Sequence, residues 1–145
     1  MQVIINLHSY LAYVVLAVLI IAVLNALSGL AGKRMFTPER DFRLSLFSLI
    51  LSHIQLLVGL ILYFISPNGL KAIMALGMGG LNASARLLAL EHPLINIIAV
   101  ALITMGWSRH KKYIEGNLKF RSIAIFYGLG LLLLLSRIPW SLWLS

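Results

Sequence analysis

A chain of 145 residues is long enough for a single domain of ordinary size. Hydrophobic residues make up 61% of it and charged residues only 11%, against about 25% in soluble domains, so lipid must solvate much of its surface. The absence of cysteine excludes disulfides and thiolate metal sites, and the net charge of +8 lies in short connections between apolar segments, which indicates membrane topology and no nucleic-acid binding.

Four apolar segments are each close to the roughly 20 residues that a helix needs to cross a bilayer. They span about residues 4–30, 44–65, 87–107 and 123–143. Thr37 is a candidate N-cap for the second helix, with Pro38 at its first position. Residues 70–76 predict a short helix in the membrane interface. We therefore predict an all-α fold, an integral membrane up-down-up-down four-helix bundle with one transmembrane domain over residues 1–145.

The basic residues predict how the bundle is oriented. Nine of the 12 lie in the connections after the first and third helices: Lys33, Arg34, Arg40, Arg43, Arg109, Lys111, Lys112, Lys119 and Arg121. Cytoplasmic connections carry an excess of Lys and Arg, so this side is expected to be cytoplasmic. Both termini then face outward, and we predict a multi-pass protein of a bacterial inner (cytoplasmic) membrane, surrounded by lipid.

Histidines inside membrane helices are the strongest functional signal in this sequence. His8 lies about four residues inside the first helix and His92 about five residues inside the third, which places both roughly 6–8 Å below the outer boundary. The first and third helices are diagonal in such a bundle. Two imidazoles at one level across the core suit the axial ligation of a haem iron, so His8 and His92 are the predicted ligands of haem b.

His53, near the middle of the second helix, leaves two alternatives open. It could pair with His92 as a second choice of ligand set, or it could act alone in hydrogen bonding or proton transfer. A structural interpretation also stands, because a single membrane histidine often only bonds a neighbouring helix. His110 lies among Arg and Lys residues, and we expect it to be solvated.

Other polar residues fit a haem whose propionates face the outer side. Arg86 and Arg137 are placed to pair with carboxylates, and Trp140 could pack at the edge of the macrocycle. Asn96 lies one turn below His92 and is a candidate partner for its imidazole. Glu91, the only acidic residue within a span, is expected either to pair with an arginine or to serve as a proton or charge relay.

Small residues predict close helix packing. Ser45, Ser48, Ser52, Gln55 and Gly59 recur at three- and four-residue steps along the second helix, and Gly128 and Gly130 lie in the fourth. Pro93 removes a backbone donor beside His92, so we expect a kink there. The bundle could also pair with a second copy through its second or fourth helix.

Several strings in the sequence carry a family likeness: 7–9 (Leu-His-Ser), 53–60 (His-Ile-Gln-Leu-Leu-Val-Gly-Leu), 91–92 (Glu-His) and 138–140 (Ile-Pro-Trp). Over most of its length the chain resembles small four-helix membrane proteins of Bacteroidetes-type bacteria that are labelled cytochrome b. It also resembles, more faintly, one four-helix half of haem A synthase, whose histidines bind haem near the outer face. The first resemblance implies a haem protein.

These observations predict a membrane-embedded b-type cytochrome that transfers electrons, with quinol or a redox protein as its partner. Two alternatives stay open at the level of sequence. One is an enzyme that modifies haem, with Glu91 and His53 as proton-transfer groups. The other is a cofactor-free membrane subunit or small transporter whose polar side chains only join helices.

Overall fold

The computed structural model describes residues 1–144 and contains four long helices. These are α1 (Gln2–Ala31), α2 (Arg43–Ile65), α5 (His92–His110) and α6 (Gly116–Ser136). Each belongs to a helical stretch long and apolar enough to cross a membrane. Many large apolar side chains on these helices are exposed, as expected where lipid is the solvent. The chain is thus a multi-pass membrane protein, and the all-α prediction is confirmed.

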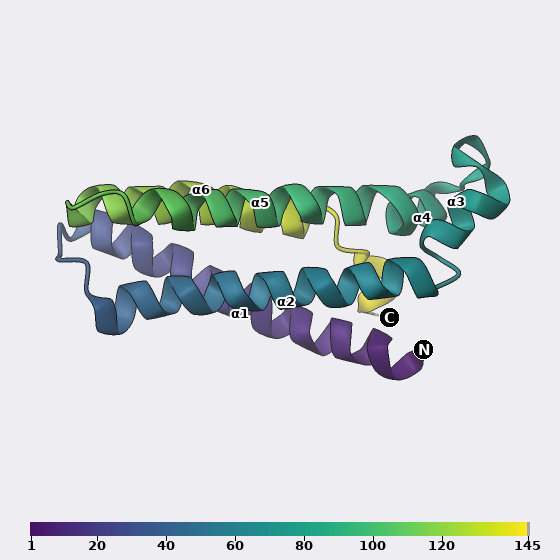
Figure 1. Ribbon diagram of the computed structural model, residues 1–145, viewed down its shortest axis with the longest axis horizontal. Coiled ribbons are helices and arrows are strands. Elements are labelled where there is room, and N and C mark those ends of the chain that lie inside the picture. Colours follow the sequence, from purple (N-terminus) through teal and green to yellow (C-terminus); the bar gives the residue numbers. More distant parts are fainter. Residues whose placement is uncertain (145) are drawn as a thin grey trace.

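The four long helices form an up-down-up-down bundle (Figure 1). Helix α1 packs against α2 and α6, and α5 packs against the same two helices from the opposite corner. Helices α1 and α5 are therefore diagonal, as predicted. Both termini lie at one end of the bundle, which we call the terminal end.

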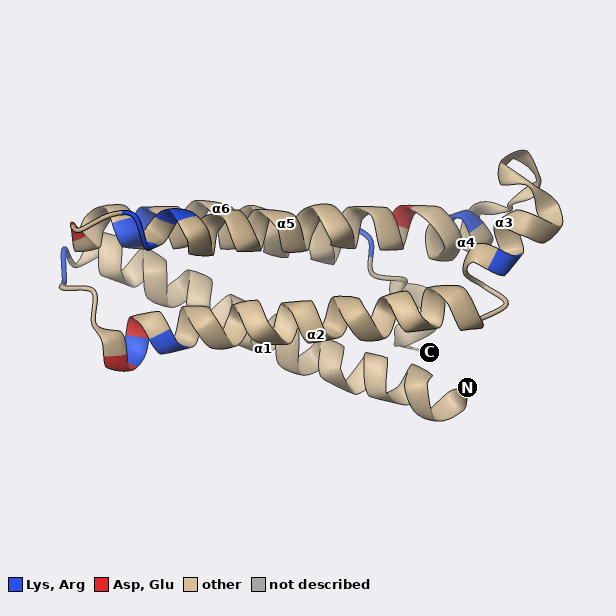
Figure 2. Cartoon of the chain, in the orientation of Figure 1, with Lys and Arg blue, Asp and Glu red and all other residues tan. Residues whose placement is uncertain are grey.

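Charge is distributed unevenly between the two ends (Figure 2). Most Lys and Arg residues gather at the end opposite the termini, here named the basic end. Only Lys71, Arg86 and Arg137 belong to the terminal end, where Glu91 is the nearby acidic residue. The fold therefore has the predicted excess of basic residues at one end of the bundle.

Short elements connect the long helices. At the basic end, the π-helical turn η1 (Pro38–Phe42) leads into α2. At the terminal end, α3 (Leu70–Leu76) matches the predicted interfacial helix, and the 3-10 turn η2 (Met78–Gly80) follows it. The chain then passes through α4 (Ala83–Arg86) and a second π-helical turn, η3 (Leu87–Glu91), into α5. Since Pro93 offers no N–H to the preceding turn, this departure from α geometry lies where the kink was expected.

The fourth helix differs from its predicted span of 123–143. Helix α6 begins seven residues earlier, at Gly116, because Lys119 and Arg121 lie in its first turns at the basic end, where they do not oppose helix formation. It ends at Ser136, and only the short α7 (Trp140–Trp143) follows. Pro139 explains the break, since it cannot continue the helix and disfavours helical geometry in the residue before it.

One glycine, Gly130, allows α6 to pack closely against α5. A Cβ on Gly130 would lie 2.7 Å from Ile103 Cγ1 and 3.0 Å from the carbonyl oxygen of Ala99, so only glycine permits α5 to approach this closely. Gly128 has no such constraint, because its nearest atom would be Val23 Cγ1 at 4.0 Å. The packing prediction therefore holds strongly for Gly130 and only loosely for Gly128.

The basic end is organised around a buried carboxylate, Asp41. Its Oδ2 accepts hydrogen bonds from Arg34 Nη1 at 2.9 Å and from the Thr37 backbone N–H at 2.8 Å. Its Oδ1 accepts from Arg34 Nη2 at 3.0 Å and from Asn25 Nδ2 at 2.8 Å. Thr37 occupies the N-cap position before Pro38, as predicted, but its side chain makes no capping hydrogen bond and donates to Asp41, whose carboxylate accepts from the Thr37 N–H. The network joins the end of α1 to the start of α2.

His110 was expected to be solvated, and this expectation is wrong. Its side chain is fully buried against the aromatic rings of Phe36, Phe42 and Trp107. Its Nδ1 bonds the carbonyl oxygen of Trp107. Lys111 lies over the Trp107 ring and Lys119 over the Phe36 ring, and Lys119 also donates to the carbonyl oxygen of His110 at 3.3 Å. The charge around His110 in the sequence therefore did not reveal how its side chain packs.

Candidate functional site

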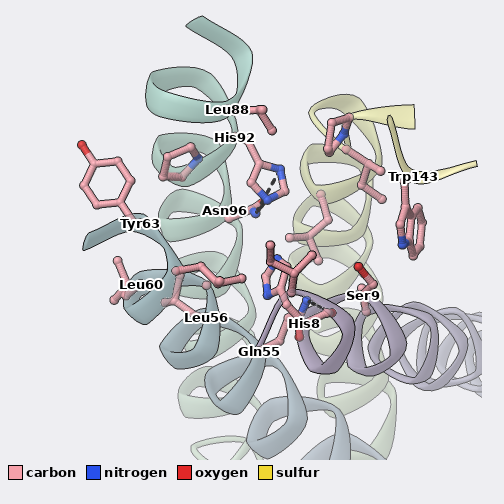
Figure 3. A pocket seen from close by; sticks show the side chains of 18 of the residues that line it. His8, Ser9, Gln55, Leu56, Leu60, Tyr63, Leu88, His92, Asn96 and Trp143 are labelled. Carbon is pink, nitrogen blue, oxygen red and sulfur yellow. Dashed lines mark hydrogen bonds between the residues drawn. The ribbon is translucent and has the colours of Figure 1, made fainter. Parts of the chain in front are cut away.

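A cavity of about 320 Å³ lies between the long helices at the terminal end. Helices α1, α2 and α5 line it, and residues after the break in α6 cover part of it. Its apolar lining includes Ala12, Leu16, Leu56, Leu60, Leu88, Pro93, Leu134, Ile138 and Trp143. Its polar lining includes His8, Gln55, His92 and Asn96 (Figure 3), and further Ser9, Ser52, Tyr63, Ser66 and Asn68. Apolar walls with a few convergent polar groups are typical of cofactor and ligand sites.

Two imidazoles from diagonal helices meet in this cavity. The ring centroids of His8 on α1 and His92 on α5 lie 6.3 Å apart, and the ring planes are nearly perpendicular, at 83°. Figure 3 shows both side chains directed into the same space. The structure thus brings together the two histidines that the helical rise places at one depth.

The tautomer of His92 follows from its partners. Its Nδ1 lies 2.7 Å from the carbonyl oxygen of Arg137, and a carbonyl only accepts, so Nδ1 carries the proton. Its Nε2 therefore holds the lone pair, which accepts a hydrogen bond from Asn96 Nδ2 at 3.0 Å. This tautomer is the one that a metal-binding imidazole uses when Nε2 is the ligand atom. Asn96 was predicted as a partner of His92, and it bonds the nitrogen that a metal would need.

His8 is held by α2 through its backbone. Gln55 Nε2 donates to the carbonyl oxygen of His8 at 2.9 Å. A Cβ on Gly59 would lie only 3.1 Å from His8 Cε1, so Gly59 leaves the room that the ring occupies. The buried His8 Nδ1 and Gln55 Oε1 have no hydrogen-bond partner among the described residues. Two buried polar atoms are therefore left unpaired close to the same helix contact.

Charged residues gather beside His92 rather than in the cavity. Glu91 Oε1 accepts from Arg86 Nε at 3.0 Å, and Glu91 Oε2 lies 3.3 Å from Arg137 Nε. The expected pairing of Glu91 with an arginine is confirmed for both arginines. Neither guanidinium lines the cavity, although both lie at the terminal end.

The tryptophan that lines the cavity is Trp143 rather than Trp140. Trp143 lines it and stacks on Tyr13 of α1, with ring centroids 4.2 Å apart. Trp140 instead donates from its Nε1 to the carbonyl oxygen of Leu135 at 3.1 Å and packs against Trp143. The sequence did not distinguish the two because both follow the break in α6.

His53 is not brought to this pair. Its side chain is exposed, and its Nδ1 donates to the carbonyl oxygen of Leu49 within α2 at 2.8 Å. Its Nε2 lies 3.3 Å from Thr104 Oγ1 of α5, whose hydroxyl donates to the carbonyl oxygen of Val100 at 2.7 Å. One ring nitrogen is thus bonded within α2 and the other contacts α5, which matches the structural interpretation of a membrane histidine.

Two features of the site were not foreseen as functional. Gly59 belonged to a predicted packing seam, but its contact with His8 depends on how α1 crosses α2. The carbonyl of Arg137 becomes available only because α6 ends at Ser136, earlier than its hydropathy suggested. Pro139 was the one local signal of that break.

The side chains that could bind a metal limit the kind of ligand that this cavity can hold. No group of three or more His, Cys, Asp and Glu side chains suited to a metal ion exists among residues 1–144. Two imidazoles are too few for a structural zinc site, which takes four protein ligands. They suffice where a macrocycle supplies the remaining donors. Comparison with protein-family models, curated proteins and solved structures finds no match to this chain.

Proposed function

We propose that this chain is a membrane b-type cytochrome in which His8 and His92 hold haem b. The observation that carries the proposal is the pair of imidazoles facing each other in one apolar cavity, 6.3 Å between ring centroids. Two metal–nitrogen bonds of about 2 Å, together with the distance from each nitrogen to its ring centroid, require a separation of roughly 6 Å. The donor set and its spacing therefore fit an axially ligated iron.

Other residues support this occupant. The cavity volume lies within the range of about 300–1,000 Å³ that ligand and cofactor pockets have. His92 already has the required tautomer, with Nδ1 fixed by the Arg137 carbonyl. Asn96 would release Nε2 on ligation, and its amide would remain as a polar neighbour. Arg86 and Arg137 lie at the terminal end, where both pair with Glu91, and either would have to exchange that partner to bind a propionate.

Haem b in this position would supply a one-electron redox centre close to one membrane surface. The basic end carries most of the positive charge, so we place it in the cytoplasm and the terminal end outside, in a bacterial inner membrane. The role we propose is electron transfer, with quinol or a redox protein as partner. The residues of the chain then bind, orient and shield the cofactor.

A spectrum of the purified protein tests the proposal. Expressed with haem available, it should show a Soret band and low-spin visible bands that shift on reduction with dithionite. His8→Ala and His92→Ala should each abolish low-spin ligation because one axial nitrogen is lost. His53→Ala is the matched control, since its ring contacts Leu49 and Thr104 away from the cavity.

Three results would contradict the proposal. A colourless protein that also fails to bind added haem would favour a cofactor-free subunit. Loss of the spectrum in His53→Ala alone would reject the ligand pair. A chemically altered macrocycle, found by extracting haem from expressing cells, would instead favour an enzyme that modifies haem.

A further inference from the structure

His92, Arg137 and Glu91 are joined in a closed circuit of contacts. The imidazole Nδ1 donates to the carbonyl oxygen of Arg137 at 2.7 Å. The guanidinium of the same Arg137 lies 3.3 Å from Glu91 Oε2, and Glu91 is joined to His92 through the backbone. Residue 137 therefore makes two contacts at the start of α5, one through its backbone with His92 and one through its side chain with Glu91, the last residue of η3.

The backbone contact depends on where α6 ends. The last carbonyls of a helix have no partner within it, and Arg137 is the first residue beyond α6, with φ −129° and ψ 18°. Its N–H still bonds the carbonyl of Leu134 at 3.3 Å, but its own carbonyl is free to accept from His92. The segment after α6 is held by Trp140, which donates to the carbonyl of Leu135, and by Trp143, which stacks on Tyr13. The ion pair of Arg137 with Glu91 adds a restraint at the residue that carries this carbonyl.

Glu91 has a second arginine partner, Arg86, but that contact has a different structural effect. Arg86 precedes Glu91 by five residues on the same side of the bundle, so the pair stays within the segment leading into α5. The pair with Arg137 instead crosses from the end of η3 to the residue that follows α6. Of the two arginine pairs, this one therefore constrains the distance between the Arg137 carbonyl and the imidazole.

We infer that Glu91 is a positioning residue for His92: by holding Arg137 it fixes the carbonyl that sets the tautomer and ring orientation of the imidazole. The consequence for ligation rests on the proposed function, because it matters to haem only if His92 is a ligand. The tautomer itself is a property of the haem-free protein. With the anchor intact, the Nε2 lone pair faces Asn96 and the cavity.

The test measures the tautomer of His92 in full-length, haem-free protein in detergent micelles. Long-range ¹H–¹⁵N correlations of histidine-labelled protein distinguish Nδ1–H from Nε2–H, and His92→Gln assigns the signal. The wild type should show Nδ1–H. Glu91→Gln should raise the ratio of Nε2–H to Nδ1–H by about fivefold or more, the effect of weakening one net hydrogen bond. Arg137→Gln should have the same effect, and the double variant should add little to either.

Arg86→Gln is the matched control, because it removes the other partner of Glu91 and leaves the crossing pair intact. Its His92 signal should match the wild type, and Arg137→Lys, which keeps a cation for Glu91, should stay close to it. An unchanged tautomer in both Glu91→Gln and Arg137→Gln would overturn the inference, as would an equal shift in Arg86→Gln. Should Glu91→Gln not fold, the Arg137 variants decide alone.

The result is separable from the haem proposal. A tautomer shift in a protein that never binds haem would leave the positioning role standing and reject the cytochrome. Haem binding that needs His8 and His92, with no tautomer shift in the variants, would reject only the positioning role.

Discussion

The Gly59→Ala substitution tests the cavity independently of the rest of the bundle. It should weaken haem binding and at the same time raise the stability of the fold. The new methyl carbon would lie 3.1 Å from His8 Cε1, tighter than ordinary van der Waals contact, so the ring must turn. Holding a side chain well off its rotamer costs about 0.5–1.5 kcal/mol, which converts to roughly 2- to 12-fold weaker haem binding. In folding, alanine is favoured over a mid-helix glycine by roughly 0.5–1 kcal/mol.

The assay titrates haem into haem-free protein at the Soret band and compares apparent Kd with thermal unfolding in the same detergent. Gly128→Ala is the matched control, because its methyl group would meet only Val23 Cγ1 at 4.0 Å. It should gain similar stability with an unchanged Kd. The reasoning is refuted if Gly59→Ala binds haem as tightly as the wild type, or if Gly128→Ala weakens binding equally.

Three further substitutions test the packing of the bundle. Gly130→Ala should lower the free energy of unfolding by roughly 1–3 kcal/mol, because its methyl group meets the carbonyl oxygen of Ala99; unfolding by denaturant that shows no loss would contradict this packing. Asp41→Ala should lower the free energy of unfolding by roughly 2–4 kcal/mol, somewhat less than for a wholly buried pair because Arg34 is partly exposed. A loss under about 1 kcal/mol by the same measurement would show that the Asp41 network does not stabilise the basic end. His110→Phe should change stability by less than about 1 kcal/mol, since the ring stays in its aromatic cluster and an unpaired buried Nε2 is removed; a loss above 2 kcal/mol would reveal a partner for that nitrogen.

The sequence was sufficient to predict the architecture, because lipid restricts the folds that a membrane-spanning chain can adopt. A helix must satisfy its own backbone in hydrocarbon, so apolar segments near 20 residues long locate the spans. Short connections then make neighbours antiparallel, which places α1 and α5 on a diagonal. Given that diagonal, the helical rise alone places His8 and His92 at one level, and the structure brings their rings within 6.3 Å.

The parts that sequence could not provide depend on contacts between distant residues. His110 appeared solvated because charge surrounds it in the chain, whereas Phe36, Phe42 and Trp107 enclose it in the fold. The acceptor for His92 is a backbone carbonyl, which carries no side-chain signal. Trp143 rather than Trp140 reaches the cavity because the turn at Pro139 rotates the last helix.

The distribution of unpaired polar atoms argues that the cavity is a binding site and not only a packing defect. Among the described residues, four buried side-chain nitrogen or oxygen atoms lack a partner, and three of them line this cavity: His8 Nδ1, Gln55 Oε1 and Asn96 Oδ1. Each such atom costs about 1–3 kcal/mol. Elsewhere α2 satisfies its buried hydroxyls, as Ser45 does by donating to the carbonyl of Asp41 at 2.8 Å. A purely structural cluster would be expected to pair its polar groups in the same way. The His8 imidazole and the Gln55 and Asn96 amides each keep one atom without that pairing, which supports our proposal that this cavity binds a molecule.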